Sequence, residues 1–271
     1  MHVLRPKVSI VVPTFNESKA VIEESLASIS GQSFIEFECL VIDESTDPEA
    51  ARACIEICER DQRFRYFHPE RRMGLAASLN LGISMARGEL IARFDSDDIC
   101  IQNRLELQVD FMVSHSDVDV LGGGIEIVGE NGESLAFRKY PSDHKSIAKR
   151  LQMTTAIAHP TAMIRKRAID EYGGYDLSFR FSEDLDLWLR FLAHGIRFAN
   201  LQQVLVKYRQ VNTYRSPTHW RFNLRARLRN FRLQFLPQRI FGICMISIWA
   251  CLPAGLQSRI FHGLVLRRNL P

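Results

Sequence analysis

The chain has 271 residues, of which 46% are hydrophobic and 24% charged, and its formal net charge is +4. This composition excludes a disordered chain and predicts one large α/β domain with an appendage, or two small domains. The six cysteines include no Cys-x-x-Cys pair and match neither a zinc site nor a disulfide framework, so we expect reduced, mostly buried thiols. No signal-peptide h-region precedes the first predicted strand, which predicts a cytoplasmic protein.

The charge is distributed unevenly along the chain. Residues 187–271 contain 14 Lys and Arg and no Asp or Glu. Residues 1–186 therefore hold 21 Lys and Arg against 31 Asp and Glu, a net charge of −10. An acidic body followed by a purely basic end predicts that the C-terminal part meets an anionic partner.

Strands and helices alternate through the first hundred residues. Apolar, β-branched runs predict strands at 8–12, 37–42 and 64–67 and one more that leads to Asp95. The predicted helices are one between Ser18 and Gly31, one that starts at Asp47-Pro48 and runs to about residue 60, and one over 75–86. This β-α-β order predicts a mainly parallel central sheet flanked by helices, an α/β fold.

The remaining residues are less regular. The predicted elements are a helix over 103–115, an extended segment over 118–128 followed by an Asn131-Gly132 turn, a strand over 161–164, a helix over 183–194 and strands over 196–208. After these, Trp220 to Arg239 is predicted to form one cationic helix, and residues 240–256 are almost uncharged. A bilayer-spanning helix needs about 20 apolar residues, and this run is shorter and interrupted by Pro253, so we expect an interfacial segment.

Polar residues follow three of the predicted strands. These segments are 13–17, 43–47 and 95–98. In open parallel sheets ligands bind beyond the carboxyl ends of the strands, so we expect all three segments on one rim. Three carboxylates crowd into Asp95-Ser96-Asp97-Asp98, and a bridging cation relieves their repulsion. Magnesium and manganese prefer such oxygen ligands. The alternative is a solvated acidic turn that caps the next helix.

The motifs as a set resemble the family 2 glycosyltransferases, inverting enzymes with the GT-A nucleotide-sugar fold. The matching segments are 8–17, 41–43, 74–83, 92–98, 159–161 and 182–189. The resemblance extends from residue 8 to about residue 210. The segments 74–83 and 159–161 are most similar to enzymes of bacterial exopolysaccharide, capsule or O-antigen assembly.

The resemblance implies roles for several of these residues. Asp43 is expected to contact the base or ribose of a nucleotide-sugar donor, in a pocket that Pro13, Thr14 and Glu17 also line. The family's habit favours a UDP-sugar over GDP- or dTDP-sugars. Asp97 is expected to bind Mg²⁺ or Mn²⁺ directly, with Asp95 nearer the ribose. The remaining role is that of Asp184, the expected catalytic base, placed at a helix start where the dipole favours an ionised carboxylate.

Neighbouring residues have competing interpretations. Asp184 can instead be a helix cap with Glu183 beside it, and Asp186 competes for the role of base. His159 is interpreted as a packed or hydrogen-bonding residue rather than a ligand, although a direct role stays open. Trp188 either stacks on a sugar or packs in the core, and its place on an amphipathic helix favours the core.

Two departures from the family pattern stand out. The segment Asp43-Glu44-Ser45-Thr46-Asp47 is one residue shorter than in many members, and Glu44 replaces an Asp. Many members also carry a histidine shortly after a Tyr-Arg pair, and none follows Tyr208-Arg209 here. Either Asn212 or Arg209 substitutes for it, or diphosphate and metal binding differ.

The sequence predicts a GT-A catalytic domain over 1–215, with a nucleotide-binding half (1–100) and an acceptor half (101–215), and a basic and apolar tail over 216–271. The acceptor is expected to be a saccharide or lipid-linked saccharide. We expect the tail to hold the enzyme at the inner face of the cell membrane on anionic lipid. Alternatives are a catalytically weak or inactive membrane scaffold of the same fold, a nucleic-acid binder acting through the Arg-rich tail, and a nucleotidyltransferase, whose Gly-rich basic loop is missing after the first predicted strand.

Overall fold

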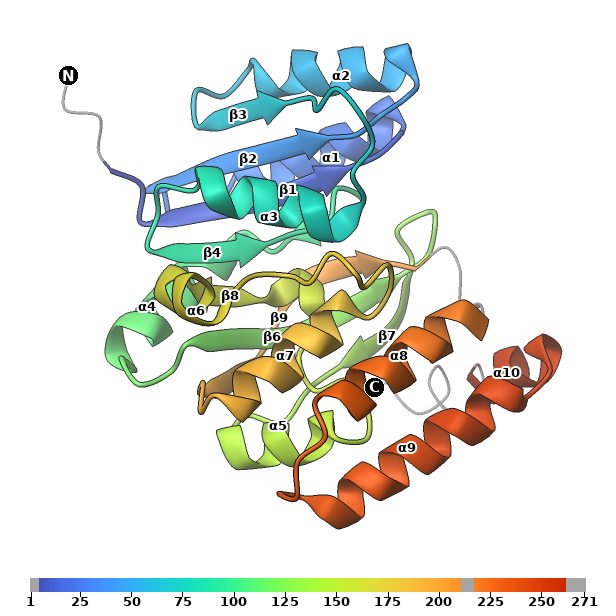
Figure 1. Ribbon diagram of the computed structural model, residues 1–271. Helices are drawn as coiled ribbons and strands as arrows, with labels where there is room; N and C mark the ends of the chain where they lie inside the picture. Colours follow the sequence, from blue (N-terminus) through green and yellow to red (C-terminus); the bar gives the residue numbers. More distant parts are fainter. Residues whose placement is uncertain (1–4, 211–216, 262–271) are drawn as a thin grey trace.

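One sheet organises the molecule, which was obtained as a computed structural model that describes residues 5–210 and 217–261 (Figure 1). In these residues nine strands pair in the order β3-β2-β1-β4-β8-β6-β9-β5, and β7 pairs with β6. The first elements are β1 (Val8–Thr14), α1 (Lys19–Ser30), β2 (Phe37–Asp43), α2 (Pro48–Cys58), β3 (Phe64–Phe67), α3 (Leu75–Met85) and β4 (Leu90–Arg93).

The second part of the chain completes the sheet and adds a C-terminal helical layer. Its elements are β5 (Ile99–Cys100), α4 (Arg104–Ser114), β6 (Val120–Val128), β7 (Ser134–Arg138), α5 (His144–Leu151), the 3-10 turn η1 (His159–Thr161), β8 (Met163–Arg165), α6 (Lys166–Tyr172), α7 (Glu183–Ala193), β9 (Phe198–Arg209), α8 (Pro217–Arg229), α9 (Leu236–Cys251) and α10 (Ala254–Phe261).

The predicted parallel arrangement holds for the first four strands. β1 pairs in parallel with both β2 and β4, and β3 pairs in parallel with β2. From β8 onward the sheet is mixed, because β8 runs antiparallel to β4 and β6 while β6 and β9 are parallel. The alternation of helices and strands therefore predicts the first hundred residues well, and the less regular remainder forms the mixed part.

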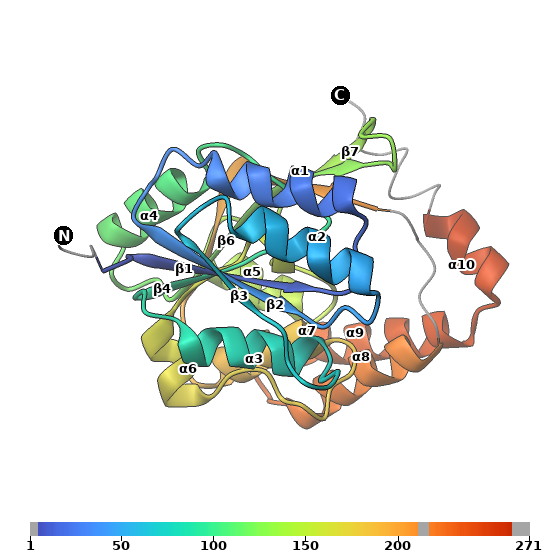
Figure 2. The same ribbon diagram turned by 90° about the horizontal axis from the view of Figure 1, so that it is seen from above.

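Two helical layers cover opposite faces of the sheet (Figure 2). Along β1, Val8, Ile10 and Val12 face a core shared with α1, α2 and α4, while Val11 faces the layer of α3, α6 and α7. This alternation follows from the period of two in a strand, and both faces are apolar because both are covered. The sheet is thereby held rigidly, with only its edges and strand ends free to form a site.

Local signals at the helix ends agree with the sequence-based expectations. The Ser18 hydroxyl accepts a hydrogen bond from the Val21 amide at 3.4 Å, and the Asp47 carboxylate accepts one from the Glu49 amide at 3.0 Å. Gly31 ends α1 as expected. Four of the cysteines, Cys39, Cys54, Cys58 and Cys100, are buried free thiols, whereas Cys244 and Cys251 are exposed.

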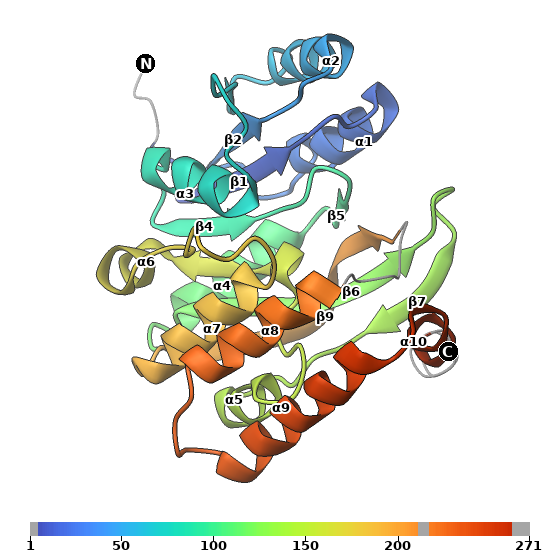
Figure 3. The same cartoon turned by 45° about the vertical axis from the view of Figure 1, so that its right-hand side comes forward.

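The single cationic helix expected between Trp220 and Arg239 is wrong. α8 ends at Arg229 and α9 begins at Leu236, and Phe235 between them has a left-handed φ of 58°. Pro237 explains the break, since a proline has no amide to donate and fits the first turn of a helix rather than its interior. The two helices lie side by side against α7 and α5 (Figure 3).

Across residues 5–210 and 217–261, none of the helices combines the length and the apolar character that crossing a membrane requires.

Candidate active site

The carboxyl ends of β1, β2 and β4 bring the three polar segments to one rim of the sheet. Thr14 at the end of β1 lies beside Asp43 at the end of β2 in the strand register. The Asn16 side-chain oxygen accepts hydrogen bonds from the amides of Thr46 at 2.8 Å and Asp47 at 3.0 Å. The first two loops are therefore joined to each other, as the open-sheet rule predicts.

The acidic turn after β4 gathers three carboxylates. Ligand oxygens of Asp95, Asp97 and Asp98 lie within 4.8 Å of one another. Burial and the charge of Asp95 raise the pKa of Asp97 to about 6. Burial and the charge of Asp97 also raise the pKa of Glu17, whose side chain lies 3.5 Å from the Ser96 hydroxyl. Negative charge is in excess here, and Glu17 adds a fourth carboxylate beside this turn.

Asp98 adds a carboxylate that was not assigned a role from the sequence. Its Oδ1 accepts a hydrogen bond from the Arg209 amide at 2.9 Å, and its buried Oδ2 has no hydrogen-bond partner among the described residues. Burial and the charges of Asp95 and Asp97 raise its pKa. Because an orphaned buried carboxylate oxygen is costly, this atom is a position where a cation fits.

Arg93 is the cation at the centre of the site. It is 5% exposed, and its guanidinium nitrogens pair with both carboxylate oxygens of Asp95. Its charge also acts on Asp97, Asp98 and Glu183. The sequence carries a signal for it, an arginine within the apolar run from Leu90 to Phe94, but does not show which acids it faces.

Arg209, at the end of β9, fixes the acidic turn from the other side. Its guanidinium donates to the Asp97 carbonyl at 3.0 Å, the Glu130 carbonyl at 3.1 Å and the Glu24 carboxylate at 2.7 Å. Three separate elements are thereby tied to one side chain. Arg209 is thus committed to positioning the turn; Asn212, the other candidate for the missing histidine, lies outside the described residues.

Asp43 and Glu44, at the end of β2, have different hydrogen-bond partners. Asp43 is fully buried, and its carboxylate accepts hydrogen bonds from the Tyr66 hydroxyl and the Ser45 amide at 2.7 and 2.8 Å. Glu44 instead accepts from the amides of Met73 at 2.7 Å and Gly74 at 2.9 Å, where α3 begins.

The departure at Glu44 therefore has a structural reason. The N-cap residue Gly74, whose φ is 88°, has no side chain with which to cap α3, and the Glu44 carboxylate lies at that helix end. A carboxylate is favoured at a helix N-terminus by the orphan amides and the dipole. Glutamate reaches this position from β2, so that the acid fixes α3 beside the rim.

A second pair of carboxylates lies at the start of α7. Asp184 Oδ1 accepts a hydrogen bond from the Leu185 amide at 2.7 Å, and Ser182 before it has a left-handed φ of 58°. Glu183 is buried; burial and the neighbouring charge of Asp184 raise its pKa to about 7. Glu183 therefore holds its proton to near neutrality.

His159 and Tyr175 connect this pair to Arg93. His159 Nε2 and the Tyr175 hydroxyl are 2.8 Å apart, and His159 Nδ1 lies 4.0 Å from the Glu183 carboxylate. Burial and the charge of Arg93 lower the pKa of His159 well below its usual range, so the ring is neutral. The charges of Arg93, Glu183, Asp184 and Asp95 all act on Tyr175. The Arg93 amide donates to the Ala162 carbonyl at 2.9 Å, which places the end of β4 beside η1, and His159 of η1 lies next to Glu183. The acidic turn after β4 and the α7 pair are therefore near each other, and nothing near Tyr175 in the sequence indicated this.

Glu183 predicts a pH-dependent stability. Its pKa is 4.5 in the unfolded chain and about 7 in the fold, so the native state binds more protons between these values. Stability from the protonated acid is complete below pH 4.5 and is lost as the pH rises through 7, by on the order of 2 kcal/mol. The free energy of unfolding in urea is measured for wild type and Glu183→Gln at pH 5 and at pH 8. Between pH 5 and pH 8 it should fall more in wild type than in the variant. Equal pH dependence of the two proteins would contradict this assignment.

Two further acceptor-side candidates are structural. Asp186 is fully buried and accepts a hydrogen bond from the Asn230 amide at 2.9 Å, so it is not placed to act as a base and instead joins α7 to the end of α8. Trp188 is 1% exposed and packs edge-on against His159 and Phe198. The sugar-stacking role for Trp188 is wrong, and the core interpretation is confirmed.

Comparisons with known proteins agree with this fold and site. A family model described as glycosyl transferase family 2 matches residues 9–173. The O-antigen biosynthesis glycosyltransferase WbnJ of Escherichia coli is 36% identical over 206 residues, covering 74% of this chain and 79% of the relative. An Escherichia coli UDP-Gal:alpha-D-GlcNAc-diphosphoundecaprenol beta-1,3-galactosyltransferase is 33% identical and covers 75% and 74%.

The likeness extends to solved structures. The crystal structure of S. aureus TarS 1-349 in complex with UDP-GlcNAc matches with a TM-score of 0.68 and 20% identity, over 95% of this chain and 79% of the TarS chain. At this identity the match shows the fold, and it confirms the predicted GT-A architecture. The chain belongs to glycosyl transferase family 2. It is therefore a glycosyltransferase.

Proposed function

We propose that this enzyme transfers a sugar from a UDP-sugar to a hydroxyl of a saccharide or lipid-linked saccharide, with inversion, in the assembly of a bacterial surface polysaccharide. One observation carries the proposal: Arg93, which pairs with Asp95 of the acidic turn, donates its backbone amide to Ala162 beside η1, and His159 of η1 lies 4.0 Å from Glu183 at the start of α7. The relatives support it, since one is named for O-antigen biosynthesis and another for a UDP-galactose donor and a diphosphoundecaprenol-linked acceptor.

A divalent cation fits the acidic turn. The three clustered carboxylates supply hard oxygen ligands, and the orphaned Asp98 Oδ2 marks a place for positive charge. Asp97 is proposed to hold Mg²⁺ or Mn²⁺ directly and Asp95, already paired with Arg93, to lie nearer the ribose. When bound, the ion supplies Lewis-acid stabilisation of the departing diphosphate.

Asp184 is proposed as the base. As the acceptor oxygen bonds to the anomeric carbon, the bond from that carbon to the diphosphate oxygen breaks on the opposite side, and the hydroxyl proton passes to the Asp184 carboxylate. The transition state has oxocarbenium character, as in the hydrolases that cleave such bonds. Position at the start of α7 favours an ionised Asp184, and the neutral His159, hydrogen-bonded to Tyr175, lies 4.0 Å from the neighbouring Glu183.

The donor nucleotide is proposed to lie along the rim formed by β1 and β2. Asp43, with Tyr66 bonded to it, is assigned to the base or ribose, and Pro13 and Thr14 contribute backbone atoms. A carboxylate accepts from an imide N–H or from ribose hydroxyls, which suits this task. Because Asp43 is fully buried, contact with the donor requires the Tyr66 hydroxyl to yield or to share its position.

A donor screen tests the function. Purified full-length protein is incubated with UDP-, GDP- and dTDP-sugars and Mg²⁺ or Mn²⁺, and release of the nucleoside diphosphate is measured with and without saccharide acceptors. Turnover of a UDP-sugar and an inverted anomeric configuration in the product are expected. Binding of a nucleotide sugar without turnover, under all these conditions, would support the inactive-scaffold alternative and contradict the proposal.

Arg209 gives a prediction about the metal requirement. Arg209→Gln removes the links from the Asp97 carbonyl to Glu24 and Glu130, so the turn is held less precisely. We expect the metal concentration for half-maximal activity to rise about tenfold, while kcat at saturating metal stays within about threefold. Lys166→Gln, which breaks an exposed ion pair with Asp170, is the control and should not change the metal response. An unchanged metal titration in Arg209→Gln would remove its positioning role.

A further inference from the structure

The outer face of α9 is apolar and uncovered. Of the sixteen large apolar side chains that are exposed in the described residues, eight lie between Leu228 and Leu256. On α9 the exposed residues recur at helical spacing and are Ile240, Phe241, Cys244, Met245, Ile248 and Cys251. We call these six residues the α9 face. Isolated exposed apolar residues are ordinary, but a contiguous set on one helix marks an interaction surface.

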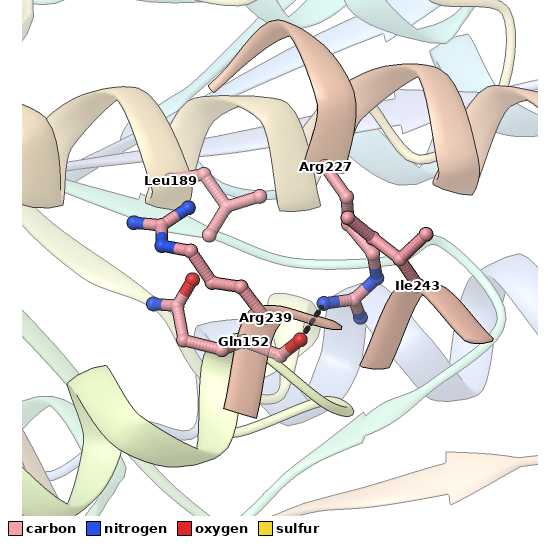
Figure 4. A pocket seen from close by; sticks show the side chains of 5 residues that line it. All are labelled: Gln152, Leu189, Arg227, Arg239 and Ile243. Carbon is pink, nitrogen blue, oxygen red and sulfur yellow. Dashed lines mark hydrogen bonds between the residues drawn. The ribbon is translucent and has the colours of Figure 1, made fainter. Parts of the chain in front are cut away.

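The opposite side of α9 is fixed on the catalytic body, which sets the direction of the α9 face. Gly242 approaches the Gln152 backbone so closely that an added Cβ would lie 2.1 Å from its carbonyl oxygen. The buried Arg227 of α8 donates to the Gln152 carbonyl at 2.6 Å and the Leu151 carbonyl at 2.9 Å (Figure 4). Arg239, also buried, donates to the Asn230 carbonyl at 2.8 Å.

These contacts change the interpretation of the tail. Arg227 and Arg239 are buried and hydrogen-bond to backbone carbonyls of the protein, and Arg229 forms an ion pair with Asp176. These three arginines have partners within the protein, so the number of arginines in the tail overstates the positive charge that an external partner can meet. Arg221 and Arg232, in contrast, are exposed, and Arg232 stands in the connection that leads into α9.

Charge distinguishes a lipid partner from other occupants. No acidic residue follows Asp186, so the α9 face has only cationic neighbours along its own part of the chain. An apolar helix face with basic flanks is the pattern of helices that lie in the headgroup region of anionic membranes. Trp249 on α9 is half-buried and packs edge-on against Trp220, and such rings favour the membrane interface.

We propose that the α9 face docks on an anionic lipid bilayer, with Arg221 and Arg232 contacting headgroups and Phe241 and Ile248 entering the acyl boundary. The α9–α10 arm lies toward the side of the molecule to which the carboxyl ends of β1 and β2 point (Figures 1 and 3). Docking there leaves the rim that carries the acidic turn next to the bilayer. A lipid-linked acceptor then reaches the site without leaving the membrane.

Vesicle sedimentation with the full chain tests this surface, and it needs no donor. Phe241→Ser/Ile248→Ser removes two side chains that are 55% and 59% exposed; Ile35→Ser/Val113→Ser, at 70% and 61%, is the matched control elsewhere on the body. Wild type and the control are expected to bind phosphatidylglycerol-containing vesicles at least tenfold better than phosphatidylcholine vesicles. The α9 variant should lose at least tenfold in that binding, and Arg221→Gln/Arg232→Gln should lose the preference for anionic lipid.

Other results overturn the proposal. Wild type that stays in the supernatant with anionic vesicles, or an α9 variant that binds as well as wild type, excludes lipid docking through this face. A wild-type dimer that becomes a monomer in the α9 variant, with no vesicle binding by either, assigns the face to a second copy instead. Donor turnover on a water-soluble acceptor, measured on every variant, reports a correctly folded site and separates failure of this inference from failure of the proposed function.

Discussion

Replacing Asp184 by Asn is expected to lower kcat for sugar transfer by about 10³-fold and to leave the affinity for UDP within about threefold of wild type. The amide keeps the size and the hydrogen bond from the Leu185 amide but cannot accept the acceptor proton. The rim at Asp43, proposed for the nucleotide, and the acidic turn follow strands β2 and β4, so on the proposed function donor binding should not depend on this carboxylate. Turnover and calorimetric UDP binding on the same preparation measure both effects.

Two variants make the Asp184 result specific. Asp170→Asn changes an exposed aspartate on α6 that pairs with Lys166, and it should retain wild-type kcat. Glu183→Gln keeps Asp184 but removes a charge that appears above pH 7, so its kcat should fall only about tenfold and chiefly at alkaline pH. If Asp184→Asn also lost UDP binding, or if Glu183→Gln were the more damaged enzyme, the base would have to be reassigned.

The elements of the first hundred residues follow closely from local signals. Continuous apolar runs predict β1 and β2. Asp47-Pro48 predicts the start of α2, because Asp caps a helix N-terminus and Pro fits the first helical position. The rim also follows, since parallel strands place their carboxyl ends together. These inferences need only neighbours in the sequence and one rule of topology.

The roles within the site depend on partners that are distant in sequence. The sequence shows Glu44 only as a departure from the family pattern, yet its carboxylate accepts a hydrogen bond from Gly74 at the start of α3, 30 residues later. The buried Asp186 accepts a hydrogen bond from the Asn230 side chain, just after α8. The Tyr175 hydroxyl lies 2.8 Å from His159, while its backbone is held by the Asn80 side chain of α3. The number of arginines in the tail likewise does not distinguish Arg227, which is buried and hydrogen-bonds to the Leu151 carbonyl, from Arg221, which is exposed. Burial decides each case, and it is a property of the whole fold.

Replacing Arg93 by Met is expected to destabilise the protein by about 3–5 kcal/mol at pH 8 and to abolish most turnover. The methionine fills the buried volume but leaves Asp95 without its ion-pair partner, beside Asp97, Asp98 and Glu183. Protonation removes that excess of negative charge, so the loss of stability should be smaller at pH 5. Millimolar Mg²⁺ or Mn²⁺ should restore part of it at pH 8, because an added cation screens the same acids.

Arg104→Met separates this electrostatic role from the cost of removing any buried arginine. Arg104 is 1% exposed and donates to the Arg93 carbonyl at 2.8 Å and the Gln108 side chain at 3.0 Å, neither of which is charged. Its loss should therefore cost similar stability at pH 5 and pH 8 and show no metal rescue. Arg93→Lys, which keeps the charge without the two-point contact to Asp95, should fall between wild type and Arg93→Met. If urea unfolding showed the same pH response for Arg93→Met and Arg104→Met, Arg93 would be a packing residue and not the cation that balances the site.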